Sequence, residues 1–105
     1  MENITVEELK KRMDAGEKLY ILDVREPDEY AASNMGAKLL PLGQIQTMQI
    51  DEIEDWKDQE VIIHCRSGHR SMVACLFLET LGFKNTKNLV GGILAWEEKY
   101  GIFKT

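Results

Sequence analysis

The sequence contains few of the residues that build disulfide frameworks and metal centres. Two cysteines and two histidines occur among its 105 residues. Cys75 lies within a helical pattern of apolar residues, which favours a core position over a disulfide with Cys65. His64, Cys65 and His69 could supply three metal ligands, but His64 alternates to the opposite strand face from Cys65, and no second cysteine or histidine cluster completes the usual four. We therefore expect no metal and no other cofactor.

The sequence also lacks long apolar runs and an excess of basic residues. No apolar stretch approaches the ~18 residues of a membrane span, and the polar, acidic N-terminus is followed by no apolar signal region. The formal net charge of -5 at pH 7 argues against a nucleic-acid partner, which requires a basic surface. We expect a soluble cytoplasmic protein that binds neither nucleic acid nor membranes. A chain of 105 residues with 44% hydrophobic content can bury one core but not two, which predicts a single domain over residues 1–105.

The pattern of apolar residues alternates between strands and helices. Thr5 and Glu8 form a capping box that begins a helix running to about Met13, and Gly16 ends it. Further strands are predicted at 18–24, 39–40, 61–63 and 88–90, and further helices around 27–30 and over 44–50, 70–81 and 93–100. Such alternation predicts an α/β fold with a central parallel sheet and helices on both faces.

The strongest candidate for chemistry is Cys65, between the predicted strand 61–63 and the helix that begins near Arg70. Functional sites of parallel sheets lie at this carboxyl end of the strands. There the loop N–H groups and the helix N-terminus favour an anion, and Gly68 allows the loop to curl its amides inward. Arg66 and Arg70 add positive charge. Because such settings lower the pKa of a cysteine from ~8.5 to roughly 3.5–7.5, we predict that Cys65 is a nucleophile rather than an inert buried residue.

Three separated motifs resemble those of the single-domain rhodanese sulfurtransferases. The active-site loop of that family is similar to Cys65-Arg66-Ser67-Gly68-His69-Arg70-Ser71. Its Asp-x-Arg strand end and following helix are similar to Ile21-Leu22-Asp23-Val24-Arg25 with Glu29-Tyr30, and its C-terminal signature to Gly91-Gly92-Ile93 with Ala95-Trp96 and Gly101. The chain departs from the family at Ser33-Asn34-Met35-Gly36-Ala37, which lacks the His and Pro of the usual Gly-His-Ile-Pro-Gly-Ala stretch.

The resemblance implies a rhodanese-like fold and a sulfur-transfer activity. Cys65 would attack the outer sulfur of an anionic donor such as thiosulfate and become a persulfide, from which cyanide, a small thiol or a protein thiol would take the sulfur. An arginine directly after the cysteine resembles thiosulfate-type loops, so Arg66 would neutralise the donor, while Arg70 would orient the loop. The substrate-binding loop would consist of Arg66, Ser67, Gly68, His69 and Arg70.

Other charged residues are assigned supporting roles. Asp23 and Arg25 lie at a strand end near the site, and either Asp23 or Glu29 would pair with an arginine to hold the loop. The acidic segment 51–60 is predicted to be a solvated surface, with a docking face for the sulfur acceptor as the alternative.

Two other classes of function stay open. Phosphatases and arsenate reductases of this fold also use a cysteine and an arginine, but they place five residues between them, whereas four separate Cys65 from Arg70. The shorter loop favours sulfur transfer, because a tetrahedral oxyanion needs a wider cradle than one sulfur atom. A non-catalytic interaction module is the third interpretation, although such a module has no need for the cysteine.

Overall fold

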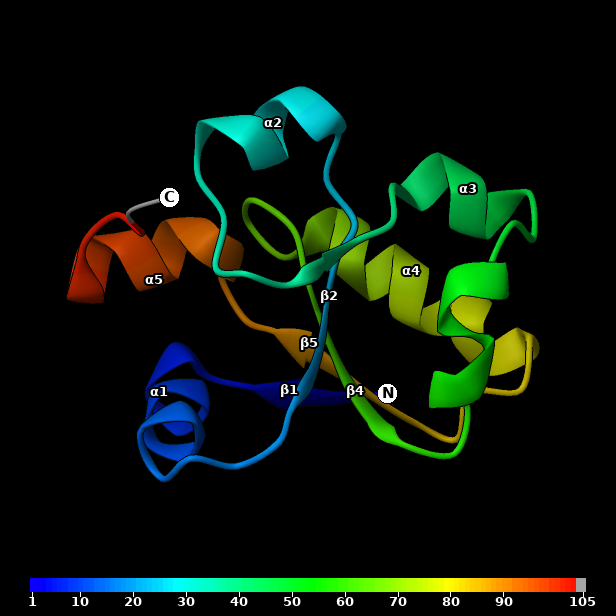
Figure 1. Ribbon diagram of the computed structural model, residues 1–105, viewed down its shortest axis with the longest axis horizontal. Helices are drawn as coiled ribbons and strands as arrows, with labels where there is room; N and C mark the ends of the chain where they lie inside the picture. The colour runs from blue at the N-terminus through cyan, green and yellow to red at the C-terminus, as the bar shows by residue number, and fades with distance from the viewer. Residues whose placement is uncertain (104–105) are drawn as a thin grey trace.

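The computed structural model describes residues 1–103, in which helices flank a five-stranded parallel sheet (Figure 1). The strand order is β1-β5-β4-β2-β3. The strands are β1 (Glu2–Ile4), β2 (Tyr20–Asp23), β3 (Lys38–Leu39), β4 (Glu60–His64) and β5 (Asn85–Leu89). The helices are α1 (Val6–Asp14), α2 (Pro27–Ala32), α3 (Leu42–Gln46), the 3₁₀ helix η1 (Asp51–Trp56), α4 (His69–Thr80) and α5 (Gly92–Tyr100).

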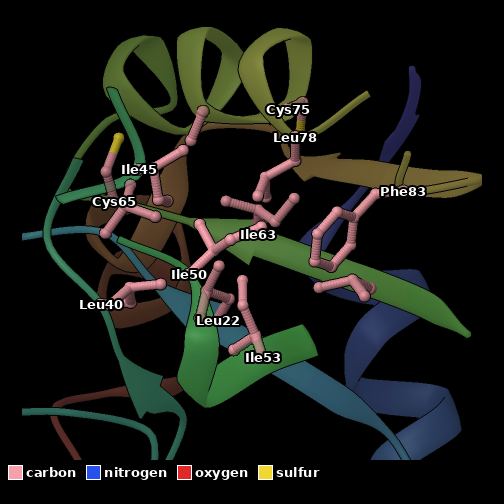
Figure 2. Close-up of a cluster of buried hydrophobic side chains, with 13 residues drawn as sticks. Leu22, Leu40, Ile45, Ile50, Ile53, Ile63, Cys65, Cys75, Leu78 and Phe83 are labelled. Carbon is pink, nitrogen blue, oxygen red and sulfur yellow. The ribbon is translucent and has the colours of Figure 1, made fainter. Parts of the chain in front are cut away.

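Helices cover both faces of the sheet, which confirms the predicted α/β architecture. On one face, Leu9 of α1 and Ile93 and Trp96 of α5 join the sheet residues Ile62 and Leu89 in a buried cluster. On the other face, side chains of α3, η1 and α4 meet those of β2 and β4 in a second cluster (Figure 2). Figure 1 shows α2 above the carboxyl end of β2, over the edge of the sheet where the predicted site lies.

The central strand β4 brings Cys65 to this edge. Val61 and Ile63 belong to the cluster beneath α4, whereas Ile62 belongs to the cluster beneath α1 and α5. This alternation is the period of two that a strand imposes. Cys65 directly follows β4 and belongs to the same cluster as Val61 and Ile63, so its side chain lies on the α4 side of the sheet.

Several element boundaries differ from the sequence predictions. The capping box is confirmed, since the Thr5 side chain accepts the Glu8 N–H at 3.1 Å and the Glu8 side chain accepts the Thr5 N–H at 3.1 Å. The helix expected over 44–50 is wrong at its end: α3 stops at Gln46, and Met48 takes a left-handed φ of 61°.

Two strands were also misjudged because their sequences are polar or short. β1 was not predicted, yet Glu2–Ile4 pair with β5 at one edge of the sheet. β5 begins at Asn85 rather than at residue 88, because pairing with both β1 and β4 satisfies the backbone of this polar strand. The acidic side chains of η1 and Asp58 are exposed, as expected for a solvated surface, while Ile53 turns into the core. Glu60 is the exception, because it is only partly exposed and pairs with Arg12 and Lys87.

Among the described residues, no helix combines the length and the apolar character that crossing a membrane requires.

Candidate active site around Cys65

The loop after β4 curls around the sulfur of Cys65. The Gly68 N–H donates to Sγ at 3.1 Å and the Ser71 N–H donates at 3.4 Å. The Ser71 hydroxyl oxygen lies 3.5 Å from the same sulfur. Gly68 adopts a φ of 105°, a left-handed conformation that a residue with a Cβ seldom takes, so the glycine lets the chain turn its amides inward. The convergence of backbone donors predicted for this loop is present.

These donors bear on the ionisation of the thiol. Cys65 is only 1% exposed, and burial raises its pKa. Hydrogen bonds with Ser71 and from the backbone N–H groups of Gly68 and Ser67 act in the opposite direction and prevail, so the pKa of Cys65 lies below its usual value. The loop therefore favours the thiolate form.

Cys75 has the opposite environment. It lies in α4 and is completely buried, and burial raises its pKa to about 12. Both cysteines are free thiols, and Figure 2 shows them on opposite sides of the apolar cluster. The expected core position of Cys75 is confirmed, and its thiol stays protonated at neutral pH.

The carbonyl groups of the loop point to α5. Cys65 O accepts the Ile93 N–H and Arg66 O accepts the Leu94 N–H, each at 3.0 Å. A Cβ on Gly92 would lie 2.5 Å from both of these carbonyl oxygens. The sequence offers Gly92 only as part of the Gly91-Gly92-Ile93 motif. In the structure it allows the N-terminus of α5 to approach the loop backbone.

Of the two acids considered as partners for an arginine, Glu29 pairs with Arg70 of the reactive loop. Its guanidinium forms a bidentate pair with Glu29 of α2, at 2.7 and 2.8 Å. The hydrogen bond from Arg70 lowers the pKa of Glu29 to about 2. This pair connects the first turn of α4 to α2.

Asp23 and Arg25 pair with each other rather than with the reactive loop. Arg25 donates Nε and Nη2 to the Asp23 carboxylate at 2.8–3.1 Å, and Nη2 also donates to Ser33 O at 2.8 Å. Both residues are buried. They connect the end of β2 to the segment after α2, so their support for the site is indirect.

His64 lies beside Asp23 on the neighbouring strand. Its Nε2 is 3.5 Å from Asp23 Oδ2 and its Nδ1 is 3.2 Å from Cys65 O. Complete burial lowers the pKa of His64, which favours the neutral ring. His69 is exposed at the start of α4. Within residues 1–103, no group of three His, Cys, Asp or Glu side chains is placed to hold a metal ion.

A family model described as the rhodanese-like domain matches residues 5–99. The chain belongs to the rhodanese-like family. This rhodanese-like domain is 40% identical over 97 residues to the putative sulfurtransferase YtwF of Bacillus subtilis, with 92% of this chain and 91% of that protein covered. It is 39% identical over 94 residues to a protein named sulfurtransferase from Allochromatium vinosum, with 89% and 85% covered. Its fold matches the crystal structure of a rhodanese-like domain protein from Staphylococcus aureus with a TM-score of 0.84 and 30% identity, covering 100% and 99% of the two chains.

Two polar residues of the rhodanese-like domain were missed as site residues. The Ser71 hydroxyl donates to Asn88 Oδ1 at 2.5 Å, and Asn88 Nδ2 donates to Gly68 O at 3.2 Å. The position of Ser71 in the first turn after the loop was a signal that could have identified it. No local pattern marks Asn88, because only the pairing of β5 with β4 brings it to the loop.

Proposed function

We propose that the protein is a sulfurtransferase that moves a sulfane sulfur from thiosulfate, or a similar anionic donor, to a thiophilic acceptor through a persulfide on Cys65. The observation that carries this proposal is the pair of N–H groups, from Gly68 and Ser71, aimed at the Cys65 sulfur. Relatives that share about two fifths of their residues with this chain are named sulfurtransferases, which supports the same class of reaction.

The first half-reaction forms the persulfide. The Cys65 thiolate attacks the outer sulfur of thiosulfate, and a new S–S bond forms. The original sulfur–sulfur bond of the donor breaks, and its electron pair leaves with sulfite. In the second half-reaction, cyanide or a thiolate attacks the outer sulfur of the persulfide, and the electron pair of the broken bond returns to Cys65. No external oxidant or reductant is required.

The burial of Cys65 limits which part of a sulfur donor can reach its Sγ atom. Since only 1% of the residue is exposed, the donor reaches it with a single protruding atom such as the terminal sulfur of thiosulfate. Arg66 is exposed beside the cysteine and is the cation that would neutralise the donor, whereas Arg70 is already paired with Glu29. The persulfide then extends outward by one S–S bond of about 2.05 Å, which brings the sulfur nearer to the acceptor.

Exposure of the protein to thiosulfate, followed by intact-mass measurement, tests the proposal. We expect the mass to rise by one sulfur atom and sulfite to be released in equal amount. Subsequent cyanide should restore the original mass and yield thiocyanate. Cys65→Ser should abolish every step, and Cys75→Ser is the matched control that should retain most of the activity.

The two alternative functions, an interaction module and a phosphatase, predict different results in the same experiment. An interaction module would gain no sulfur, and a phosphatase would hydrolyse a phosphate ester in a Cys65-dependent manner. Either result would refute sulfur transfer as the function. Equal losses in the Cys65→Ser and Cys75→Ser variants would refute the assignment of the nucleophile.

A further inference from the structure

Asn88 is a buried polar residue of β5 beside the end of β4. It is 7% exposed, and the parallel register pairs it with Ile63, two residues before Cys65. Residues paired across neighbouring strands point to the same face of the sheet. The Asn88 amide therefore lies on the side of the sheet that carries the Cys65 sulfur.

The two ends of this amide bind Gly68 and Ser71, whose N–H groups both donate to the sulfur. Oδ1 accepts the Ser71 hydroxyl at 2.5 Å, and Nδ2 donates to Gly68 O at 3.2 Å. Because a carbonyl oxygen can only accept, the orientation of the amide is determined by Gly68. Gly68 N and Ser71 N in turn lie 3.1 and 3.4 Å from Cys65 Sγ.

Gly68 is the residue of the loop whose backbone is least restrained by its own side chain, so the hydrogen bond from Asn88 Nδ2 matters most there. Without a Cβ, its backbone dihedrals rotate with little steric cost, and a loop without side-chain contacts would also populate orientations in which the N–H points away from the sulfur. The bond from Asn88 favours the orientation seen here. Gly68 O also accepts the Met72 N–H at 3.3 Å. Through these two hydrogen bonds, Gly68 O connects α4, which contains Met72, to β5, which contains Asn88.

We propose that Asn88 is a positioning residue for Cys65 that holds Gly68 and Ser71 so that their N–H groups point at the sulfur. The proposal deepens the proposed function, on which it rests, by assigning the support of the thiolate to a side chain of β5. Asn88 acts through the loop, and its loss should leave the thiolate with fewer aligned donors.

The pH dependence of iodoacetamide alkylation in a Cys75→Ser background tests this role. Asn88→Ala removes both side-chain bonds, and the loss of the bond to Gly68 O should raise the midpoint of Cys65 alkylation by about one pH unit, the equivalent of one lost charge-assisted hydrogen bond. Asn85→Ala, at the exposed start of the same strand, is the matched control and should leave the midpoint unchanged. An unchanged midpoint in Asn88→Ala, once the Ser71 hydroxyl has also been removed, would overturn the proposal.

The Ser71 hydroxyl needs a separate control. Its proton is held by Asn88 in the structure, and Asn88→Ala releases this proton to the thiolate, which would lower the midpoint. In a Ser71→Ala background, Asn88→Ala removes only the bond to Gly68 O. We expect the midpoint to rise in the Ser71→Ala background, and a midpoint that stays or falls there would refute the proposed role.

Alkylation needs no sulfur donor, so this test stands apart from the test of sulfur transfer. A protein that accepts no sulfur but shows the shifted midpoint retains the role of Asn88 and loses only the proposed function. In an active protein, kcat/KM should fall by up to about tenfold at pH values below both midpoints and recover above the new midpoint. If Asn88→Ala does not fold, Asn88→Leu keeps a side chain of similar size and removes both hydrogen bonds without adding a charge. The same upward shift is expected in the Ser71→Ala background, with Asn85→Leu as its control, and an unchanged midpoint would again overturn the proposal.

Discussion

Substitution of Gly92 by alanine should displace the reactive loop, because the structure leaves no room for a Cβ at this position. The new atom would lie 2.5 Å from the carbonyl oxygens of Cys65 and Arg66 and 2.6 Å from the Arg66 carbonyl carbon. All three are backbone atoms, so no side-chain rotation can relieve the overlap. Gly92 also has a φ of 61°, which costs an alanine about 1–2 kcal/mol.

The clash adds to this conformational cost. Relief requires the loop and α5 to separate, which weakens the bonds from Ile93 N to Cys65 O and from Leu94 N to Arg66 O. Each such bond contributes about 1 kcal/mol. Gly92→Ala should therefore destabilise the protein by about 3–4 kcal/mol, which corresponds to a fall in Tm of roughly 15 °C or more for a domain of this size. Displacement of Cys65 by about 1 Å should also reduce sulfur transfer on the order of 10²-fold.

Substitutions of two other glycines serve as controls that separate the conformational cost from the steric clash. Gly36 has a φ of 79° and no heavy atom within 4 Å of its hypothetical Cβ, so Gly36→Ala reports the conformational cost alone. Gly43 also faces open space but lies in α3 with an ordinary φ, so Gly43→Ala should be neutral or slightly stabilising. The assays are thermal unfolding and cyanolysis of all three variants. If Gly92→Ala destabilises the protein no more than Gly36→Ala does, the close approach of α5 to the loop does not hold the site, and the reasoning fails.

Two further predictions concern the charged residues of the site. Arg66→Ala should raise KM for thiosulfate about 10- to 150-fold with a smaller change in kcat, as expected for a lost charge-assisted hydrogen bond of roughly 1.5–3 kcal/mol, and an unchanged kcat/KM would show that Arg66 does not bind the donor. The pair of Glu29 with Arg70 should stabilise the fold by about 1 kcal/mol over Glu29→Gln, measured by urea unfolding. Because the folded-state pKa of Glu29 is lowered from 4.5 to about 2, this difference should be complete above pH 4.5 and be lost as the pH falls through about 2. Asp58→Asn, which breaks the exposed pair with Lys84, is the matched control and should have little effect on stability, and a Glu29 difference that does not decrease between pH 4.5 and pH 2 would contradict the assignment.

The sequence by itself determined the parts of this protein that depend on local patterns. The capping box at Thr5 and Glu8, the buried strand before Cys65 and the apolar helix after it are each encoded within a few residues. The sequence therefore predicted the α/β fold, the position of Cys65 at the carboxyl end of a strand and the inward turn at Gly68. The nucleophilic role of Cys65 and the donor-binding role of Arg66 stay predictions.

Only the tertiary structure decided which distant residues meet at the loop. Glu29 and Asp23 were equally plausible partners for an arginine, and the choice of Glu29 for Arg70 follows from the placement of α2 over the sheet edge. Asn88 belongs to a polar strand with little hydrophobic pattern, and its contact with Gly68 exists because β5 pairs with β4. The close approach at Gly92 likewise depends on the docking of α5. Hydrogen bonds and contacts between segments far apart in the chain leave no periodic signal, because their geometry is set by the packing of whole elements.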